Sequence, residues 1–166
     1  MENSPIHSRF GAAPRVDEIL HGSPEYHRSI LARDRILRQP LGLQLTAEDT
    51  RGEEAQRHFV LRSADMILGG LIAQANEPET IRLRQMWIEP THSGQGLGRQ
   101  LLNEVIARLR NEGAGQIQLH AREVVIGFYQ KLGFTMEGPR FEEVGIPHRQ
   151  MTLKLNPETQ SPGDHR

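Results

Sequence analysis

Residues 85–102 read QMWIEPTHSGQGLGRQLL. An apolar segment ends at a proline, a turn with glycines at 94, 96 and 98 follows, and a helical pattern begins at about residue 98. Because glycine lacks a Cβ, the main chain of such a turn can curl closely around a ligand. The turn also leads into a helix N-terminus, where unpaired N–H groups and a partial positive charge favour an anion. The segment therefore predicts a phosphate-binding loop built from main chain.

Two familiar phosphate-binding motifs do not fit this turn. A P-loop requires Lys followed by Ser or Thr after the glycines, and a dinucleotide fingerprint requires Gly-x-Gly-x-x-Gly. Counted from Gly94, the third glycine position is Arg99, and counted from Gly96 it is Leu101. What remains is Ser93-x-x-Gly96-x-Gly98 after a strand and a proline. A turn that only joins strand to helix stays open as an alternative, although a joining turn seldom needs three glycines.

Length and composition narrow the class of protein. The chain has 166 residues, enough for one well-cored domain and short for two. With 20 Lys and Arg against 21 Asp and Glu, no basic face indicates a nucleic-acid partner. No apolar run approaches the length of a membrane span, so we expect no membrane partner. The absence of cysteine excludes disulfides and a thiol nucleophile and fits a cytoplasmic protein without proving it.

The pattern of polar and apolar residues predicts one folded domain over 25–155. The polar ends, 1–24 and 156–166, are expected to be flexible segments. Periodicity and turn residues predict helices at 25–38, 98–112 and 123–132, a short helix starting at 46–49, and strands at 58–62, 66–74, 81–88, 116–121, 134–138, 141–144 and 149–155. The strand–helix–strand crossover around 98–112 must join parallel neighbours, and the other connections favour antiparallel pairs. The fold class is α+β, or an α/β three-layer sandwich in looser usage.

Two local patterns refine this prediction. Gly69-Gly70 inside a strand indicates a bulge or close packing. Along 81–88, alternation places Arg82, Arg84, Met86 and Ile88 on one face of the strand and Leu83, Gln85 and Trp87 on the other. The helix at 98–112 should bury a stripe formed by Leu101, Leu102, Val105, Ile106 and Leu109.

Three motifs together resemble the GNAT superfamily of CoA-dependent N-acetyltransferases. The segment Ser93-x-x-Gly96-x-Gly98 is similar to its pyrophosphate loop, Gln/Arg-x-x-Gly-x-Gly/Ala, with Ser93 in the first position. Residues 128–134, FYQKLGF, are similar to its Phe-Tyr-x-Lys-Leu-Gly-Phe segment, and residues 143–148 resemble a bacterial subset that ends in Glu-x-Gly-Ile-Pro-His. The resemblance covers about 25–155. It implies a GNAT fold whose sheet is splayed at the strand pair 81–88 and 116–121.

The resemblance implies acetyl-CoA as cosubstrate and direct transfer to an amine, which needs no protein nucleophile. It also implies that Tyr129 protonates the departing CoA sulfur. Residue by residue, the cofactor-binding positions it implies are Met86, Trp87, Ile88, Ser93, Gly94, Gln95, Gly96, Leu97, Gly98, Arg99, Arg122, Phe128 and Lys131. No zinc-ligand pattern is present, and we expect no metal.

The general base is not identified by the sequence. Several GNAT enzymes carry Glu or His at the positions of Arg82 and Arg84, and an arginine cannot abstract a proton. Either a chain of water molecules removes the proton from the amine, or another side chain does. The candidates are Glu89, His120, Glu123, Glu142 and His148. The acceptor is expected to contact residues among Arg84, His120, Glu142 and His148.

The sequence thus predicts an acetyl-CoA-dependent N-acetyltransferase acting on a primary amine of a small molecule, peptide or protein. The alternative is a CoA-binding regulatory or catalytically degenerate domain of the same fold. A homodimer is among the states that the sequence leaves open.

Overall fold

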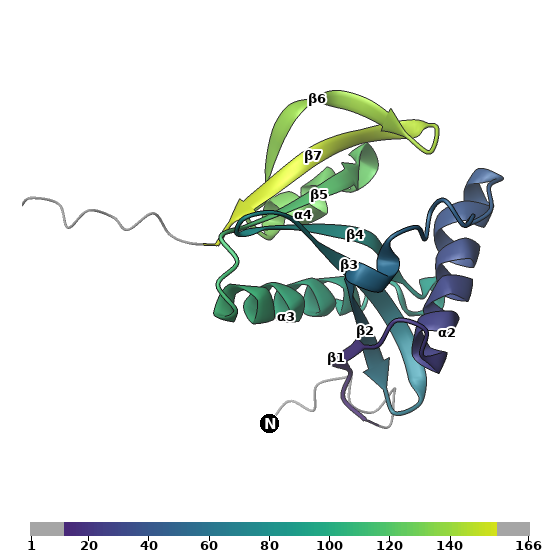
Figure 1. The fold of residues 1–166 in the computed structure, drawn as a ribbon. Helices are drawn as coiled ribbons and strands as arrows, with labels where there is room; N and C mark the ends of the chain where they lie inside the picture. The colour runs from purple at the N-terminus through teal and green to yellow at the C-terminus, as the bar shows by residue number, and fades with distance from the viewer. Residues whose placement is uncertain (1–11, 156–166) are drawn as a thin grey trace, which may run out of the picture. The chain divides into compact units, whose positions relative to one another are not determined.

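The computed structural model describes residues 12–155, in which seven strands form a sheet of order β1-β2-β3-β4-β5-β7-β6. β4 and β5 pair in parallel, whereas β1–β2, β2–β3, β5–β7 and β6–β7 are antiparallel. This mixed sheet with helices confirms the α+β fold class (Figure 1). The strands are β1 (Arg15–Ile19), β2 (Arg57–Ser63), β3 (Met66–Glu77), β4 (Thr80–Ile88), β5 (Gln116–Arg122), β6 (Thr135–Glu143) and β7 (Ile146–Lys154), and the α-helices are α2 (Pro24–Arg33), α3 (Leu97–Asn111) and α4 (Ile126–Lys131).

The described chain falls into two compact units. The first contains the residues up to Gln74 together with Arg84–Val105, and the second contains Ala75–Leu83 together with the residues from Ile106 onward. The parallel ladder between β4 and β5 covers Thr80–Leu83 and Gln116–Leu119, the first four residues of each strand. The ladder thus ends at the pair Leu83 and Leu119. Of the helices in the described part, none has the length and apolar character to span a membrane.

The first unit is built around the indole of Trp87. It packs in one cluster with Ala32 of α2, Val60 of β2 and Ile67 of β3, all of them buried. The predicted close packing at Gly69-Gly70 is confirmed, because a Cβ on Gly69 would lie 2.7 Å from the Trp87 carbonyl oxygen. The register between β2 and β3 also shifts at this level, so the bulge is present as well. The two glycines let β3 lie directly against β4.

The second unit is organised by the β6–β7 hairpin and its neighbour β5. Figure 1 shows β6 and β7 as a long bent hairpin next to β5. The strand β5 alternates as predicted, with Ile117, Leu119 and Ala121 buried. Phe134 and Met151 are also buried in this unit.

The apolar stripe predicted for α3 is confirmed, since Leu101, Leu102, Val105, Ile106 and Leu109 are all buried.

The observed structure differs from the predicted elements in four main ways. Part of the expected flexible segment 1–24, Arg15–Ile19, is the strand β1, because β2 offers it an antiparallel edge; residues 1–11 and 156–166 lie outside the described part. The helix predicted at 25–38 is an α-helix only to Arg33 and continues as a π-helical turn, Asp34–Arg38. The strands predicted at 134–138 and 141–144 are one strand, β6, interrupted by a register shift.

The fourth difference is the short helix predicted to start at 46–49. Thr46 and Asp49 close a turn on each other instead, with the Thr46 N–H donating to Asp49 Oδ2 at 2.8 Å. The Asp49 N–H donates to Thr46 Oγ1 at 3.4 Å, and the Asp49 side chain also forms an ion pair with Arg38 at 3.4 Å. Thr46 and Asp49 therefore bond to each other as the residues of a helix cap do, but no helix follows them.

Candidate active site

The glycine-rich loop presents a row of main-chain donors. The N–H of Ser93 donates to the Pro90 carbonyl at 3.2 Å, and the first bond of α3 runs from Gln100 N–H to the Gly96 carbonyl at 3.0 Å. Between them, the amides of residues 94–99 donate no hydrogen bond to any part of the chain that the structure describes. These donors stand at the start of a 15-residue helix, whose dipole favours an anion there.

The conformation of the loop requires its glycines. Gly94 and Gly96 both have φ of +76°, a left-handed conformation that other residues rarely adopt. Nothing lies within 4 Å of the Cβ that either residue lacks. The loop is therefore shaped for a group that approaches from outside, and the residues present fit a diphosphate. Leu97 is buried, so its contribution is its amide and not its side chain.

The strand before the loop carries a backbone irregularity. Gln85 has φ of +53°, so the chain turns in the left-handed region within the strand, a feature that the predicted alternation of 81–88 did not indicate. Such strained non-glycine residues are often found at functional sites. Met86 and Ile88 on either side of Trp87 are half-buried, whereas the Trp87 indole is a core side chain. The buried indole cannot contact a cofactor, so only a contact through the main chain of Trp87 stays predicted.

A buried ion pair holds Gln85 in place. Arg33 and Glu53 form two parallel bonds of 2.8 and 2.7 Å, with side chains 2% and 0% exposed. Arg33 Nε also donates to Gln85 Oε1 at 3.3 Å, and Tyr26 donates its hydroxyl to Glu53 at 2.8 Å. Burial raises the pKa of Glu53, but its bonds to Arg33 and Tyr26 and the charge of Arg84 outweigh burial, so the pKa lies below its usual value. This network was not predicted from the sequence.

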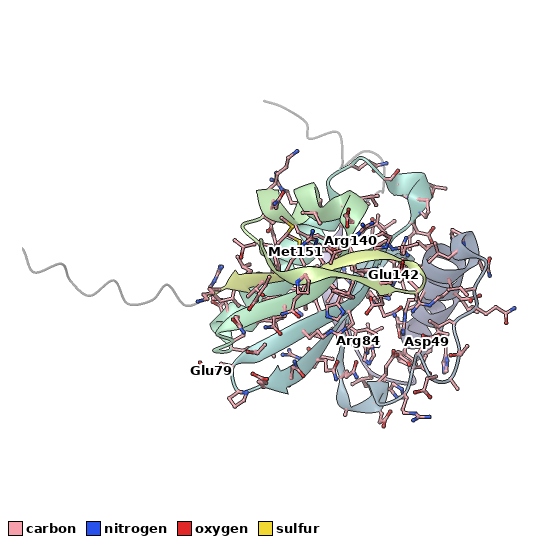
Figure 2. All side chains as sticks on the ribbon, turned by 90° about the horizontal axis from the view of Figure 1, so that it is seen from above. Asp49, Glu79, Arg84, Arg140, Glu142 and Met151 are labelled. Atoms are coloured by element: carbon pink, nitrogen blue, oxygen red, sulfur yellow. The ribbon has the colours of Figure 1, made fainter. Side chains whose placement is uncertain are left out.

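Arg84, predicted to contact the acceptor, belongs to the same network. Its Nη1 donates to Gln56 Oε1 at 2.7 Å and lies 4.0 Å from Glu53 Oε2. Figure 2 labels Arg84 on β4. Its charge is thus already matched within the first unit.

Tyr129 lies in the second unit on α4, with aromatic neighbours. Its ring centroid is 5.1 Å from that of Phe128 and 5.7 Å from that of Phe134. Burial raises the pKa of Tyr129 to about 12, and the positive charge of Arg122 opposes this only in part. The hydroxyl therefore keeps its proton at neutral pH and is a donor. Lys131, at the end of the same helix, is exposed.

The residues predicted as general base or as acceptor contacts differ in their ion-pair partners and in their exposure. Glu89 is paired with Arg35, and Glu123 is paired with Arg140 at 2.8 Å. Glu142 is exposed on β6 (Figure 2).

His120 and His148 are brought together by Glu143, which sequence reasoning missed. The signal was available, because the period of two along 141–143 puts Glu143 on the same face as Phe141 and opposite Glu142.

Known proteins similar to this chain were found both by sequence and by structure. Over 50 residues the chain is 44% identical to serotonin N-acetyltransferase 2 of Oryza sativa subsp. japonica, covering 30% of this chain and 25% of that protein. Over 77 residues it is 31% identical to the uncharacterized protein YyaT of Bacillus subtilis, covering 46% and 52%. The chain thus spans a quarter to about half of the length of these curated relatives.

Solved structures share the fold at low sequence identity. Escherichia coli ElaA superposes with a TM-score of 0.73 at 18% identity, over 85% of this chain and 99% of that one. A Bacillus subtilis acetyltransferase in complex with CoA gives a TM-score of 0.66 at 18% identity, over 86% and 99%. The family model described as "Acetyltransferase (GNAT) domain" matches residues 39–155. The chain therefore belongs to the GNAT acetyltransferase family.

Proposed function

We propose that this protein is an acetyl-CoA-dependent N-acetyltransferase that transfers the acetyl group directly to a primary amine of a small molecule, peptide or protein. The observation that carries the proposal is the row of amides at 94–99, which donate no hydrogen bond within the described part of the chain, in a member of the GNAT family. The structural relative solved in complex with CoA supports the same cosubstrate.

The chemistry assigns a separate task to each group. The amides of 94–99 bind the diphosphate, and the main chain of Met86 and Ile88 aligns the pantetheine arm and its thioester. A neutral amine attacks the thioester carbonyl carbon, the new N–C bond forms, and the C–S bond breaks with its electron pair on sulfur. Tyr129 then supplies a proton to the thiolate, the amine nitrogen gives up a proton that passes to solvent, and solvent restores the proton of Tyr129. Positioning both reactants contributes on the order of 7–11 kcal/mol to lowering such a barrier.

A second candidate function is a CoA-binding module without turnover. Arg82 and Arg84 stand where several relatives of this superfamily carry a basic Glu or His, and Arg84 is bonded to Gln56. This observation favours a domain that keeps the loop and has lost the reaction. The two candidates share CoA binding and differ in whether thiol is released from acetyl-CoA when amines are present.

The test of CoA binding is Gly96→Glu, measured by isothermal titration calorimetry. We expect CoA binding to be abolished, because a carboxylate would meet the diphosphate in the loop. Gly22→Glu is the matched control, since Gly22 has φ of +79° and, like Gly96, nothing within 4 Å of its missing Cβ. Both variants carry similar backbone strain, and only the first should lose CoA. Unchanged affinity in Gly96→Glu, or equal loss in both variants, would count against the site.

Free-thiol release from acetyl-CoA over a panel of amines then separates the enzyme from the binding module. CoA binding with thiol release that depends on an amine supports the transferase. CoA binding with no release over the whole panel supports the module.

A further inference from the structure

Four strands of the second unit bring charged and titratable side chains into one cluster. Arg82 comes from β4, His120 from β5, Glu143 from β6 and His148 from β7. Glu143 Oε1 lies 3.0 Å from His120 Nδ1, and Glu143 Oε2 lies 3.5 Å from His148 Nε2. The ring of Phe141 packs edge-on against His120 with centroids 4.8 Å apart. Neither the loop nor Tyr129 belongs to this cluster, which we call the His120–Glu143 cluster.

Two incompatible partners share one nitrogen of His120. Arg82 Nη2 lies 2.8 Å from His120 Nδ1, the same atom that faces Glu143 at 3.0 Å. Arginine only donates hydrogen bonds and an ionised carboxylate only accepts them. A protonated Nδ1 therefore bonds to Glu143, and an unprotonated Nδ1 bonds to Arg82. The cluster thus places two tautomers of neutral His120 in competition.

The surroundings of Glu143 favour the tautomer that bonds to it. Its hydrogen bond with His120, together with the charges of His148 and Arg82, holds the pKa of Glu143 below its usual value, so it is an anion and an acceptor. His148, 5% exposed, points Nδ1 at the Ile146 carbonyl at 2.9 Å and Nε2 at Glu143. Glu143 therefore lies between two imidazoles, and a neutral His148 donates to only one of the two acceptors that its nitrogens face.

The other nitrogen of His120, Nε2, takes no part in these contacts. His120 Nε2 makes no hydrogen bond within residues 12–155, and the side chain is 25% exposed. When Nδ1 carries the proton that it donates to Glu143, Nε2 carries a lone pair and is the basic atom. A carboxylate that fixes the tautomer of a histidine in this way is the arrangement by which a general base is oriented.

We propose that His120 is the general base of the acetyl transfer, with Glu143 as its positioning residue and Arg82 as the competing donor. In the step itself, Nε2 takes a proton from the amine nitrogen as the N–C bond forms and the C–S bond breaks. The imidazolium then returns this proton to solvent. The inference deepens the proposed function and rests on it, since it supplies the base that Arg82 and Arg84 cannot provide.

The tautomer of His120 is the first test, because it needs no acceptor. The full chain labelled with 15N-histidine is studied by NMR from pH 5.5 to 9, and the signals of His120 are assigned with His120→Gln. We expect neutral His120 to carry its proton on Nδ1. In Glu143→Leu the proton should move to Nε2, because only Arg82 remains as a partner. Glu142→Leu, at the exposed neighbouring position of β6, is the matched control and should leave the tautomer unchanged. A neutral wild-type His120 protonated on Nε2 would overturn the inference.

The second test is the pH dependence of thiol release from acetyl-CoA with the best amine of the panel. The charged groups that contact His120 are Arg82 and Glu143, and His148 contacts Glu143 through its other carboxylate oxygen, so the acid limb of the wild type is compared with that of each variant. We expect His120→Gln to lower kcat by about 10²-fold or more and to remove the limb that follows the NMR titration, with CoA affinity unchanged. Glu143→Leu should lower kcat and displace the limb, whereas Glu104→Leu, at an exposed position of α3, should do neither. Two amines of different basicity separate the ionisation of the substrate from that of the enzyme.

The outcomes distinguish the two proposals. Thiol release that is indifferent to His120→Gln overturns the role of His120 and leaves the transferase standing. CoA binding without release from any amine overturns both the transferase and the base, while the NMR result still reports whether Glu143 sets the tautomer. Loss of release in His120→Gln with the wild-type tautomer on Nδ1 supports the inference.

Discussion

Burial is the main reason why both tyrosines of this chain hold their protons. Burial raises the pKa of Tyr129 to about 12. The pKa of Tyr26 is also about 12, through burial and its hydrogen bond to Glu53. Both hydroxyls are therefore donors at neutral pH. Tyr26 already donates to a buried carboxylate, whereas the proposed function gives the proton of Tyr129 to the CoA sulfur.

At this scale we predict that Tyr129→Phe lowers kcat for thiol release by about 10²-fold or more, because it removes the general acid. CoA affinity, measured by calorimetry, should stay within about twofold, since the binding amides are untouched. Tyr26→Phe is the matched control and should reduce stability without a comparable loss of kcat. A Tyr129→Phe enzyme with wild-type kcat would exclude the hydroxyl as the acid.

At the scale of the elements, β3 and β4 can lie this close together only because Gly69 and Gly70 have no side chains. A Cβ on Gly69 would lie 2.5 Å from Ile88 Cδ1 and 2.7 Å from the Trp87 carbonyl oxygen, and the second of these atoms belongs to the main chain. The strand that leads to the loop therefore keeps its position only while β3 stays this close. The sequence predicted close packing at Gly69-Gly70. It did not predict the partner, Trp87, which lies 18 residues beyond Gly69 in the chain.

We expect Gly69→Ala to destabilise the protein by about 1–3 kcal/mol, because the new methyl group must displace main chain. Gly127→Ala is the control, since Gly127 lies in α4 with nothing within 4 Å of its missing Cβ. In a helix this change should be neutral or stabilising by up to about 1 kcal/mol. Urea unfolding of both variants measures the difference, and an equal effect would show that β3 and β4 can move apart at no cost.

At the scale of the whole molecule, the buried carboxylate of Glu53 connects distant segments of the first unit. Glu53 is bonded to Arg33 and Tyr26 of α2, and its carbonyl accepts a hydrogen bond from His58 of β2 at 2.8 Å. One short turn, Glu53–Ala55, thereby joins a helix and a strand far apart in the sequence. Removing one partner of such a pair leaves the other charge buried and uncompensated.

We predict that Glu53→Gln lowers the free energy of unfolding at pH 7 by about 3–5 kcal/mol. Because the folded pKa of Glu53 is depressed, its contribution is present above the unfolded value of 4.5 and is lost as pH falls through the folded pKa. The variant should therefore show a weaker loss of stability below about pH 4.5 than the wild type. Urea unfolding from pH 3 to 8 measures both effects. Glu48→Gln, which breaks the exposed pair with Arg51, is the control and should change stability by about 0.5 kcal/mol or less. Equal effects in the two variants would contradict the role of Glu53.

The sequence by itself determined the fold class, the loop at 93–98 and the buried stripe of α3, because each depends on a local pattern: glycine spacing, apolar periodicity and turn residues. Only the tertiary structure decided that Gln85 turns into the left-handed region, since the Arg33 and Glu53 that hold it come from distant segments. The same is true of the His120–Glu143 cluster, whose members meet only because β4, β5, β7 and β6 are neighbours in the sheet. Local patterns specify elements, whereas the pairing of charges depends on the register between strands that no local pattern contains.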